Sequence, residues 1–210
     1  MRTPGAAVMD FSEFRQVSAL NQRFRRVLSV FRIVAAHVGV RGRSSDESAS
    51  HLAGRIGAIG RAVLATISDG VDLESLVLDE LRLHTARPGQ FSISGPEVRL
   101  DPNAADLMSL VIHELATNAV KYGALSQPRA QISVKWQSVH RLGRRILQFE
   151  WRETGVSITG GAQPTPGFGS ELIERHIARE LKGEGKMSFL ADGVCCAIEI
   201  PLGEARRSHE

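Results

Sequence analysis

Three polar side chains recur at helical spacing in the middle of the chain. Glu114, Asn118 and Lys121 stand four and three residues apart, so they share one face of a helix. A carboxylate, a carboxamide and an ammonium group in a row suit Mg²⁺ and phosphate oxygens, which are natural partners of such groups. The same stripe exposed to solvent would have no function, and the spacing alone leaves both interpretations open.

Two later segments favour the phosphate interpretation. Residues 151–155 have the sequence Trp-Arg-Glu-Thr-Gly, which places an acid and then a glycine at the end of a predicted strand. Residues 167–170 have the sequence Gly-Phe-Gly-Ser and begin a predicted helix. Free backbone N–H groups and the positive end of the helix dipole attract anions there. Either segment alone is a weak signal, but the three in this order are much more specific.

The stretch from His113 to Leu125 resembles the N-box of ATP-binding domains of the GHKL class, in the form typical of HWE sensor histidine kinases. That family is named for the N-box histidine, here His113, and for a Trp-x-Glu sequence, here Trp151 and Glu153. Residues 167–175 resemble the second glycine box of the family. The resemblance extends over roughly residues 15–202, nearly the whole chain.

The resemblance implies a site for ATP and Mg²⁺. Asn118 would be the Mg²⁺ ligand, and Glu114 would be the catalytic acid that orients the metal's water or assists the attacking group. Glu153 would accept a hydrogen bond from the adenine amino group. The other residues that the resemblance assigns to ATP binding are His113, Lys121, Tyr122, Gly155, Gly167, Phe168, Gly169 and Ser170. Lys121 would contact phosphate and the glycines would hold the triphosphate, whereas His113 and Trp151 have no assigned role beyond packing near the site.

The chain departs from the family pattern at two places. The family usually has a second glycine after the position of Gly155, where this chain has Val156, so we expect reduced nucleotide affinity. The family's first helix carries Leu-Asn-His-Arg-x-Lys-Asn, whose histidine accepts the phosphoryl group. This chain has Gln22 in place of the histidine and Arg26 in place of the last asparagine. A carboxamide has no nucleophilic nitrogen comparable with that of imidazole, so we predict no autophosphorylation at this position.

Three functions fit this combination of motifs. In the first, a response-regulator phosphatase or phosphorelay regulator docks a receiver domain, with Arg23, Arg25 and Arg26 facing its acidic pocket. Gln22 would then orient a water toward the aspartyl phosphate, as glutamine does in other phosphoryl hydrolyses. In the second, an ATP-sensing pseudokinase binds a receiver or a sensor kinase without chemistry. In the third, a kinase phosphorylates a partner chain. We favour the first.

The elements that must position these residues divide the chain near residue 70. Between Val17 and Val38 apolar residues recur at steps of three and four, and Leu52, Ile56, Ile59 and Val63 continue this pattern. We predict an antiparallel helical hairpin over residues 1–70, which pairs with a second copy as a dimeric four-helix bundle. Packing of the hairpin on the following domain of a monomer is the alternative.

We predict that residues 71–203 form an ATP-binding domain of the α+β class and that residues 204–210 form a tail. The order of elements is a helix at about 72–84, short strands near 90–94 and 97–100, and a long helix from Asp101 and Pro102 to near Gly123. Strands at 131–139 and 145–152, a helix at 170–181 and two strands around the Asp192–Gly193 turn follow. Since βαβ alternation is missing, we predict a mixed, mostly antiparallel sheet with helices on one face. The resemblance implies the GHKL (Bergerat) α/β sandwich.

Composition and charge narrow the class of protein further. The net charge of the 210 residues is +3. Residues 1–70 carry ten arginines against five acids, so this N-terminal third is basic. Nucleic acid is not an expected partner, because the few aromatic residues do not alternate with the arginines. No apolar run approaches the roughly 18 residues of a membrane-spanning helix, residues 1–10 lack signal-peptide features, and the adjacent Cys195 and Cys196 cannot pair normally. We therefore expect a cytoplasmic protein without membrane insertion.

Overall fold

The computed structural model describes residues 21, 24, 28, 30–35, 45–65, 70–84, 87, 89–156 and 167–203. The chain divides into two compact units, Met1–Val40 and Arg41–Glu210. In the first unit residues 30–35 are helical, within the first helix predicted from the apolar pattern. Residues 36–44 lie outside the described residues, so the hairpin is not confirmed. The domain boundary near residue 70 stays a prediction.

The second unit begins with α2 (Ser45–Ala65), which packs along the long helix α4 (Pro102–Lys121). Arg55, Ala58 and Ile59 are buried on α2, whereas Ile56 is 42% exposed. Ile56 of the predicted apolar seam is thus exposed in the single chain, where the predicted pairing with a second copy is not tested, and the face toward α4 buries an arginine instead. Gly54 allows this close packing, because a Cβ at Gly54 would lie 2.8 Å from Nε2 of His113.

A five-stranded sheet forms the base of this unit, with the strand order β2-β4-β5-β7-β6. The strands are β2 (Phe91–Ser94), β4 (Gln131–Arg141), β5 (Arg144–Thr154), β6 (Glu184–Leu190) and β7 (Gly193–Pro201). Only β2 and β4 are parallel within it, which confirms a mixed, mostly antiparallel sheet. A separate short ladder joins β1 (Val71–Asp72) to β3 (Arg99–Leu100). The parallel pair is connected through α4, so the expectation that βαβ alternation is missing does not hold for this pair.

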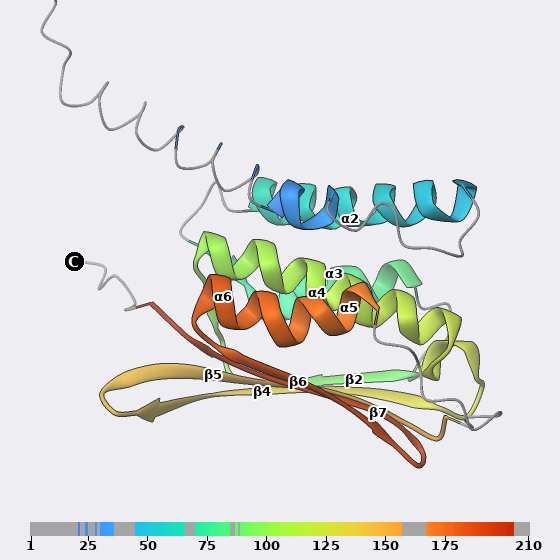
Figure 1. The fold of residues 1–210 in the computed structure, drawn as a ribbon. Helices are drawn as coiled ribbons and strands as arrows, with labels where there is room; N and C mark the ends of the chain where they lie inside the picture. The colour runs from blue at the N-terminus through green and yellow to red at the C-terminus, as the bar shows by residue number, and fades with distance from the viewer. Residues whose placement is uncertain are drawn as a thin grey trace, which may run out of the picture. The chain divides into compact units, whose positions relative to one another are not determined.

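Helices cover one face of the sheet, and α2 lies on their far side (Figure 1). The layer against the sheet contains α3 (Leu73–His84), α4, α5 (Phe168–Glu171) and α6 (Ile177–Leu181), with a π-helical turn at Leu172–His176 between the last two. Because α4 lies between the sheet and α2, its residues from Ala104 to Ala116 are all buried. Trp136, Phe149 and Trp151 fill the sheet side of this core.

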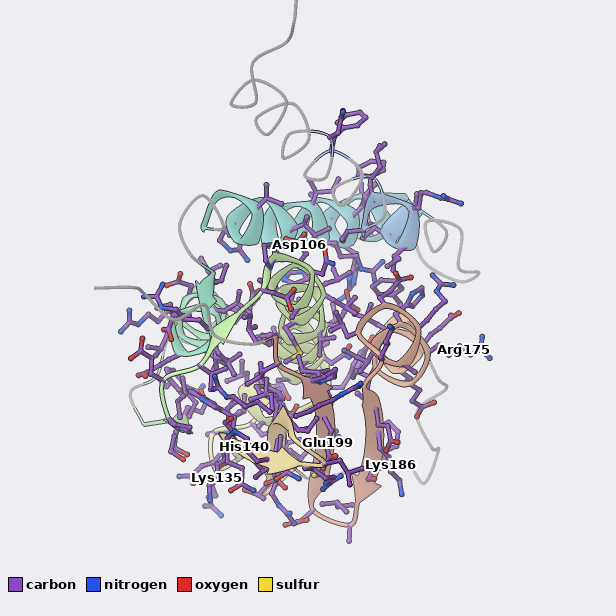
Figure 2. The ribbon with its side chains drawn as sticks, turned by 90° about the vertical axis from the view of Figure 1, so that its left-hand side faces the viewer. Asp106, Lys135, His140, Arg175, Lys186 and Glu199 are labelled. Atoms are coloured by element: carbon purple, nitrogen blue, oxygen red, sulfur yellow. The ribbon has the colours of Figure 1, made fainter. Side chains whose placement is uncertain are left out.

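Local sequence signals account for the ends of α4. The side chain of Asp101 accepts hydrogen bonds from the backbone N–H groups of Asn103 and Ala104 at 2.9 and 3.1 Å, and Pro102 follows at the first helical position. This confirms the predicted start of the helix. Figure 2 shows Asp106, from the first half of α4, on the side of α2, whereas Lys135 and Glu199 lie among the strands. Within the described segments, no helix is both long and apolar enough to cross a membrane.

Candidate nucleotide-binding site

The long helix α4 places Glu114, Asn118 and Lys121 along one face, as their spacing predicts. Glu114 is buried, Asn118 is half-buried and Lys121 is exposed, so the stripe runs from the interior to the surface. Gly169 of α5 lies against the buried end of the stripe. A Cβ at Gly169 would lie 3.5 Å from Nδ2 of Asn118 and 3.5 Å from Cβ of Glu114. The fold therefore brings together two motifs that are about fifty residues apart in sequence.

The glycine segment presents backbone to this stripe. Gly167 is exposed and precedes α5, and no described side chain caps this helix end. Phe168 and Gly169 are buried. The hydroxyl of Ser170 lies 3.8 Å from Sδ of Met187, so this side chain faces strand β6. The backbone at Gly169 thus lies within ordinary packing distance of the N-box side chains.

Arg55 of α2 is bound to the N-box acid. Its Nε lies 2.6 Å from Oε1 of Glu114 and its Nη2 lies 3.1 Å from Oε2, a two-point ion pair. The side chains of both residues are at most 6% exposed. The same guanidinium stands 3.9 Å from the ring centroid of Phe168. The sequence analysis did not single out Arg55, although an arginine among the small residues Gly54, Gly57 and Ala58 was a usable signal.

His113, the histidine of the family name, faces away from this stripe. Its Nδ1 lies 2.7 Å from Oε1 of Glu80 on α3, and Nε2 of His84 lies 3.1 Å from the same oxygen. Arg61 of α2 forms an ion pair with the other oxygen of Glu80. Burial alone would raise the pKa of Glu80. The hydrogen bonds from His113 and His84 and the charges of His113 and Arg61 outweigh burial, so this pKa lies well below its ordinary value.

The ligand atoms of Glu80, His84 and His113 lie within 4.8 Å of one another, a spacing that a metal ion could use. The same atoms are already joined by hydrogen bonds. A divalent cation would replace shared protons and stand beside the guanidinium of Arg61. These contacts favour a hydrogen-bonded structural cluster, which anchors α3 and α2 to α4.

The Trp-x-Glu pair also has a defined structure. The indole Nε1 of Trp151 donates to Oε1 of Glu153 at 3.1 Å, and the backbone N–H of Ala124 donates to Oε2 at 2.6 Å. Burial raises the pKa of Glu153 above its ordinary value, although these two hydrogen bonds lower it in part. A Cβ at Gly123 would collide with the same carboxylate. Trp151 and Glu153 thus tie strand β5 to the turn that follows α4, which gives Trp151 a positioning role.

The remaining predicted residues lie at the edges of this arrangement or outside it. Gly155 has a φ of +73°, and a Cβ there would lie 3.3 Å from the backbone of Arg129 and Ala130. Tyr122 is 71% exposed, and the ammonium group of Lys121 contacts Nε2 of His51 on α2. Gln22, Arg23, Arg25 and Arg26 lie outside the described residues, so their predicted roles stay predictions.

The mixed sheet, the helical layer and the adjoining N-box and glycine segments together define a histidine-kinase type of catalytic fold. The solved structure of the EL346 blue-light activated histidine kinase of Erythrobacter litoralis matches 96% of this chain and 62% of its own, with a TM-score of 0.62 and 17% identity. The histidine kinase domain of the same protein matches 90% of this chain and 91% of its own, with a TM-score of 0.54 and 19% identity. At these identities the likeness shows the fold alone.

Sequence comparison extends the likeness to homology. The chain is 30% identical over 197 residues to Blue-light-activated histidine kinase 1 of Erythrobacter litoralis, which covers 90% of this chain and 53% of the relative. It is 27% identical over 213 residues to the Blue-light-activated histidine kinase of Rhizobium johnstonii, covering 92% and 58%. No family model matches the chain. The chain spans little more than half the length of these relatives. It is a histidine-kinase homologue, and the predicted resemblance to HWE histidine kinases is confirmed.

Proposed function

We propose that the chain binds ATP with Mg²⁺ on the face of α4 that carries Glu114, Asn118 and Lys121. The contact of Gly169 with Asn118 and Glu114 is the observation that supports this most, because the polar stripe and the glycine segment meet there. The side-chain oxygen of Asn118 suits Mg²⁺, which prefers oxygen ligands. Lys121 and the N–H groups of the glycine segment supply positive potential for phosphate. Bound Mg²⁺ would neutralise phosphate charge.

Glu153 and Gly155 would lie on the adenine side of this site. Glu153 already accepts from Trp151 and Ala124, and each carboxylate oxygen has capacity for a second hydrogen bond. Because the side chain is buried, we propose that it contributes mainly by holding the turn after α4 in place. The close packing of Gly155 on residues 129 and 130 supports the same role for the backbone there.

We further propose that the chain acts in two-component signalling on a phosphorylated receiver domain. Its relatives are histidine kinases, and Gln22 stands where the motif has the phosphoacceptor histidine. Gln22 would orient a water for attack on the aspartyl phosphate. The new bond joins the water oxygen to phosphorus, the bond from phosphorus to the aspartate oxygen breaks, and inorganic phosphate leaves. Arg23, Arg25 and Arg26 would face the acidic pocket of the receiver.

The receiver proposal is tested by following phosphate loss from receiver domains loaded with acetyl phosphate. A panel of receivers from the same genome replaces the unknown cognate partner. We expect the wild-type chain to speed dephosphorylation of at least one receiver and Gln22→Ala to abolish the effect, whereas Gln16→Ala on the same segment keeps it. If Gln22→Ala is as active as wild type, the water-orienting role of Gln22 is wrong.

A second candidate function is an ATP-sensing pseudokinase, which the ion pair between Arg55 and Glu114 favours. Both oxygens of this acid are engaged and shielded, so the arrangement suits binding without catalysis. Labelling with γ-labelled ATP separates the candidates. We expect the wild-type chain to stay unlabelled and Gln22→His to gain acid-labile phosphate that Asn118→Ala abolishes. If Gln22→His binds ATP but stays unlabelled, the pseudokinase is preferred. If the wild-type chain is labelled, Gln22 does not prevent phosphorylation and another acceptor is present.

A further inference from the structure

Arg55 lies where α2 packs against the proposed nucleotide site. Only 3% of this residue is exposed, so its ion pair with Glu114 is an interior contact and not a surface salt bridge. Gly54 lets the two helices approach, since a Cβ at Gly54 would meet the ring of His113. The position of α2 and the state of the N-box acid are thus fixed together.

The same guanidinium links two separate parts of the site. It binds both oxygens of Glu114 from one side and covers the ring of Phe168, the residue before Gly169. With both oxygens bound to the guanidinium and the pair buried, this carboxylate presents little surface to water or to an attacking group. A Mg²⁺ ion held by Asn118, one helical turn from Glu114, would also be repelled by the guanidinium.

We propose that Arg55 is a positioning residue that couples α2 to the nucleotide site. While the ion pair is intact, Glu114 and Phe168 are held in a closed arrangement, and binding of ATP with Mg²⁺ displaces Arg55 and loosens α2. The inference rests on the proposed ATP binding. Because coupling between two equilibria is reciprocal, loss of the ion pair between Arg55 and Glu114 must raise nucleotide affinity by the same factor by which bound nucleotide favours breaking this pair.

Arg61 supplies a matched control on the same helix. It also forms an ion pair with a buried acid of the layer below, but that acid is Glu80, outside the proposed nucleotide site. A purely structural anchor would act alike at both arginines. A role in nucleotide coupling would belong to Arg55 and not to Arg61.

The experiment compares the full wild-type chain with Arg55→Met and Arg61→Met, and methionine keeps much of the aliphatic stem while removing the charge. Calorimetry measures the affinity for ATP with Mg²⁺, and circular dichroism confirms folding. We expect Arg55→Met to bind about fivefold more tightly or better, and Arg61→Met to keep the wild-type affinity. Hydrogen exchange of residues 49–65 in the wild-type chain, which needs no variant, should become faster when ATP and Mg²⁺ are added.

Each result either supports or overturns the coupling of α2 to the nucleotide site. Faster exchange in α2 with nucleotide and tighter binding by Arg55→Met alone support the coupling. If wild type binds ATP but exchange in α2 is unchanged, or if folded Arg55→Met binds no more tightly than wild type, the coupling is wrong while the proposed function stands. An equal gain for both variants reduces Arg55 to a general anchor and also overturns it. If no form of the chain binds ATP, the proposed function fails and the coupling fails with it.

Discussion

Three buried glutamates of this domain differ in the charge of their hydrogen-bond partners. Glu80 and Glu114 are each paired with an arginine from α2, whereas Glu153 accepts from two neutral N–H groups. The cationic partners keep Glu80 ionised, and the pKa of Glu153 is raised because burial outweighs its neutral donors. Ionisation of Glu80 therefore stabilises the folded state, whereas ionisation of Glu153 destabilises it.

Replacement of Glu80 by glutamine should destabilise the fold in a manner that depends on pH. The folded pKa of Glu80 lies below the unfolded value near 4.5, so its contribution is present above that value and is lost as the pH falls toward the folded pKa. We expect Glu80→Gln to lower the free energy of unfolding by about 3 kcal/mol at pH 7. Below pH 4.5 this difference should shrink by about 1.4 kcal/mol for each unit. Urea unfolding of both proteins at a series of pH values measures this difference in the free energy of unfolding.

Glu74→Gln is the matched control, because Glu74 is exposed on the same helix. It should leave the free energy of unfolding within about 0.5 kcal/mol of wild type. A loss at Glu80→Gln that stays constant between pH 7 and pH 3 would contradict the ionised cluster.

Trp151→Phe should destabilise the fold more at high pH than at low pH. The variant loses the N–H group that donates to Glu153, so the ionised carboxylate becomes harder to bury. A folded pKa raised above the unfolded value costs stability once the pH rises above the unfolded value, and the cost is complete above the folded pKa. We expect a loss of about 1–2 kcal/mol at pH 8 and a smaller loss at pH 4. Trp136→Phe is the control, because that indole donates to the backbone oxygen of Pro96 and its loss should not vary with pH.

The helix α2 packs against α4 through a specific set of residues. This packing depends on small residues on one face of α2 and on two arginines that reach acids on α4 and α3. Propensity and periodicity predicted this helix and an apolar seam through Ile56, which is exposed in the single chain. The burial of Arg55 on the face toward α4 was not predicted, because an apolar heptad pattern gives no sign of a buried arginine.

Gly54→Ala should weaken the packing of α2, and Gly60→Ala should not. A Cβ at Gly54 would lie 2.8 Å from Nε2 of His113, whereas a Cβ at Gly60 meets no described atom within 4 Å. We expect Gly54→Ala to lower the free energy of unfolding by about 1–3 kcal/mol. Gly60→Ala should raise it by up to about 1 kcal/mol, since alanine favours a helix more than glycine. If both variants are equally stable, α2 does not pack on His113 as described.

Other elements followed from the sequence closely. The capping signal at Asp101 and Pro102, the alternation of β4 and β5 and the turn at Asp192–Gly193 gave elements within a few residues of their observed bounds. The parallel pairing of β2 with β4 did not follow, because a four-residue strand carries too little pattern to reveal its partner. The π-helical turn at 172–176 has no signal in the side-chain pattern that we used.

The sequence predicted the residue types of the candidate site but not the side chains that contact them. The spacing of Glu114, Asn118 and Lys121 predicted their shared helix face, whereas a common site with the glycine segment was implied only by the family resemblance. The ion pair with Arg55 and the cluster around Glu80 arise from packing between helices that are distant in sequence. Such long-range contacts depend on the relative placement of helices, which local pattern does not encode.

The chain as a whole combines a histidine-kinase type of fold with a segment in which Gln22 stands at the predicted acceptor position. Its sequence also contains the predicted N-box, the Trp-x-Glu pair and the glycine segment. The chain aligns with about half the length of its histidine-kinase relatives. Nucleotide binding at α4 is required both for the ATP-sensing pseudokinase and for the coupling through Arg55.

Titration of ATP into the full chain by calorimetry, with and without Mg²⁺, is the direct test of nucleotide binding at α4. The wild-type chain should bind one ATP with an affinity that increases with Mg²⁺, and Asn118→Ala should weaken binding in Mg²⁺ by about tenfold or more. Asn103→Ala, an exposed residue in the first turn of the same helix, should bind as wild type does. No binding by the wild-type chain, or equal binding by Asn118→Ala, would contradict a nucleotide site on α4.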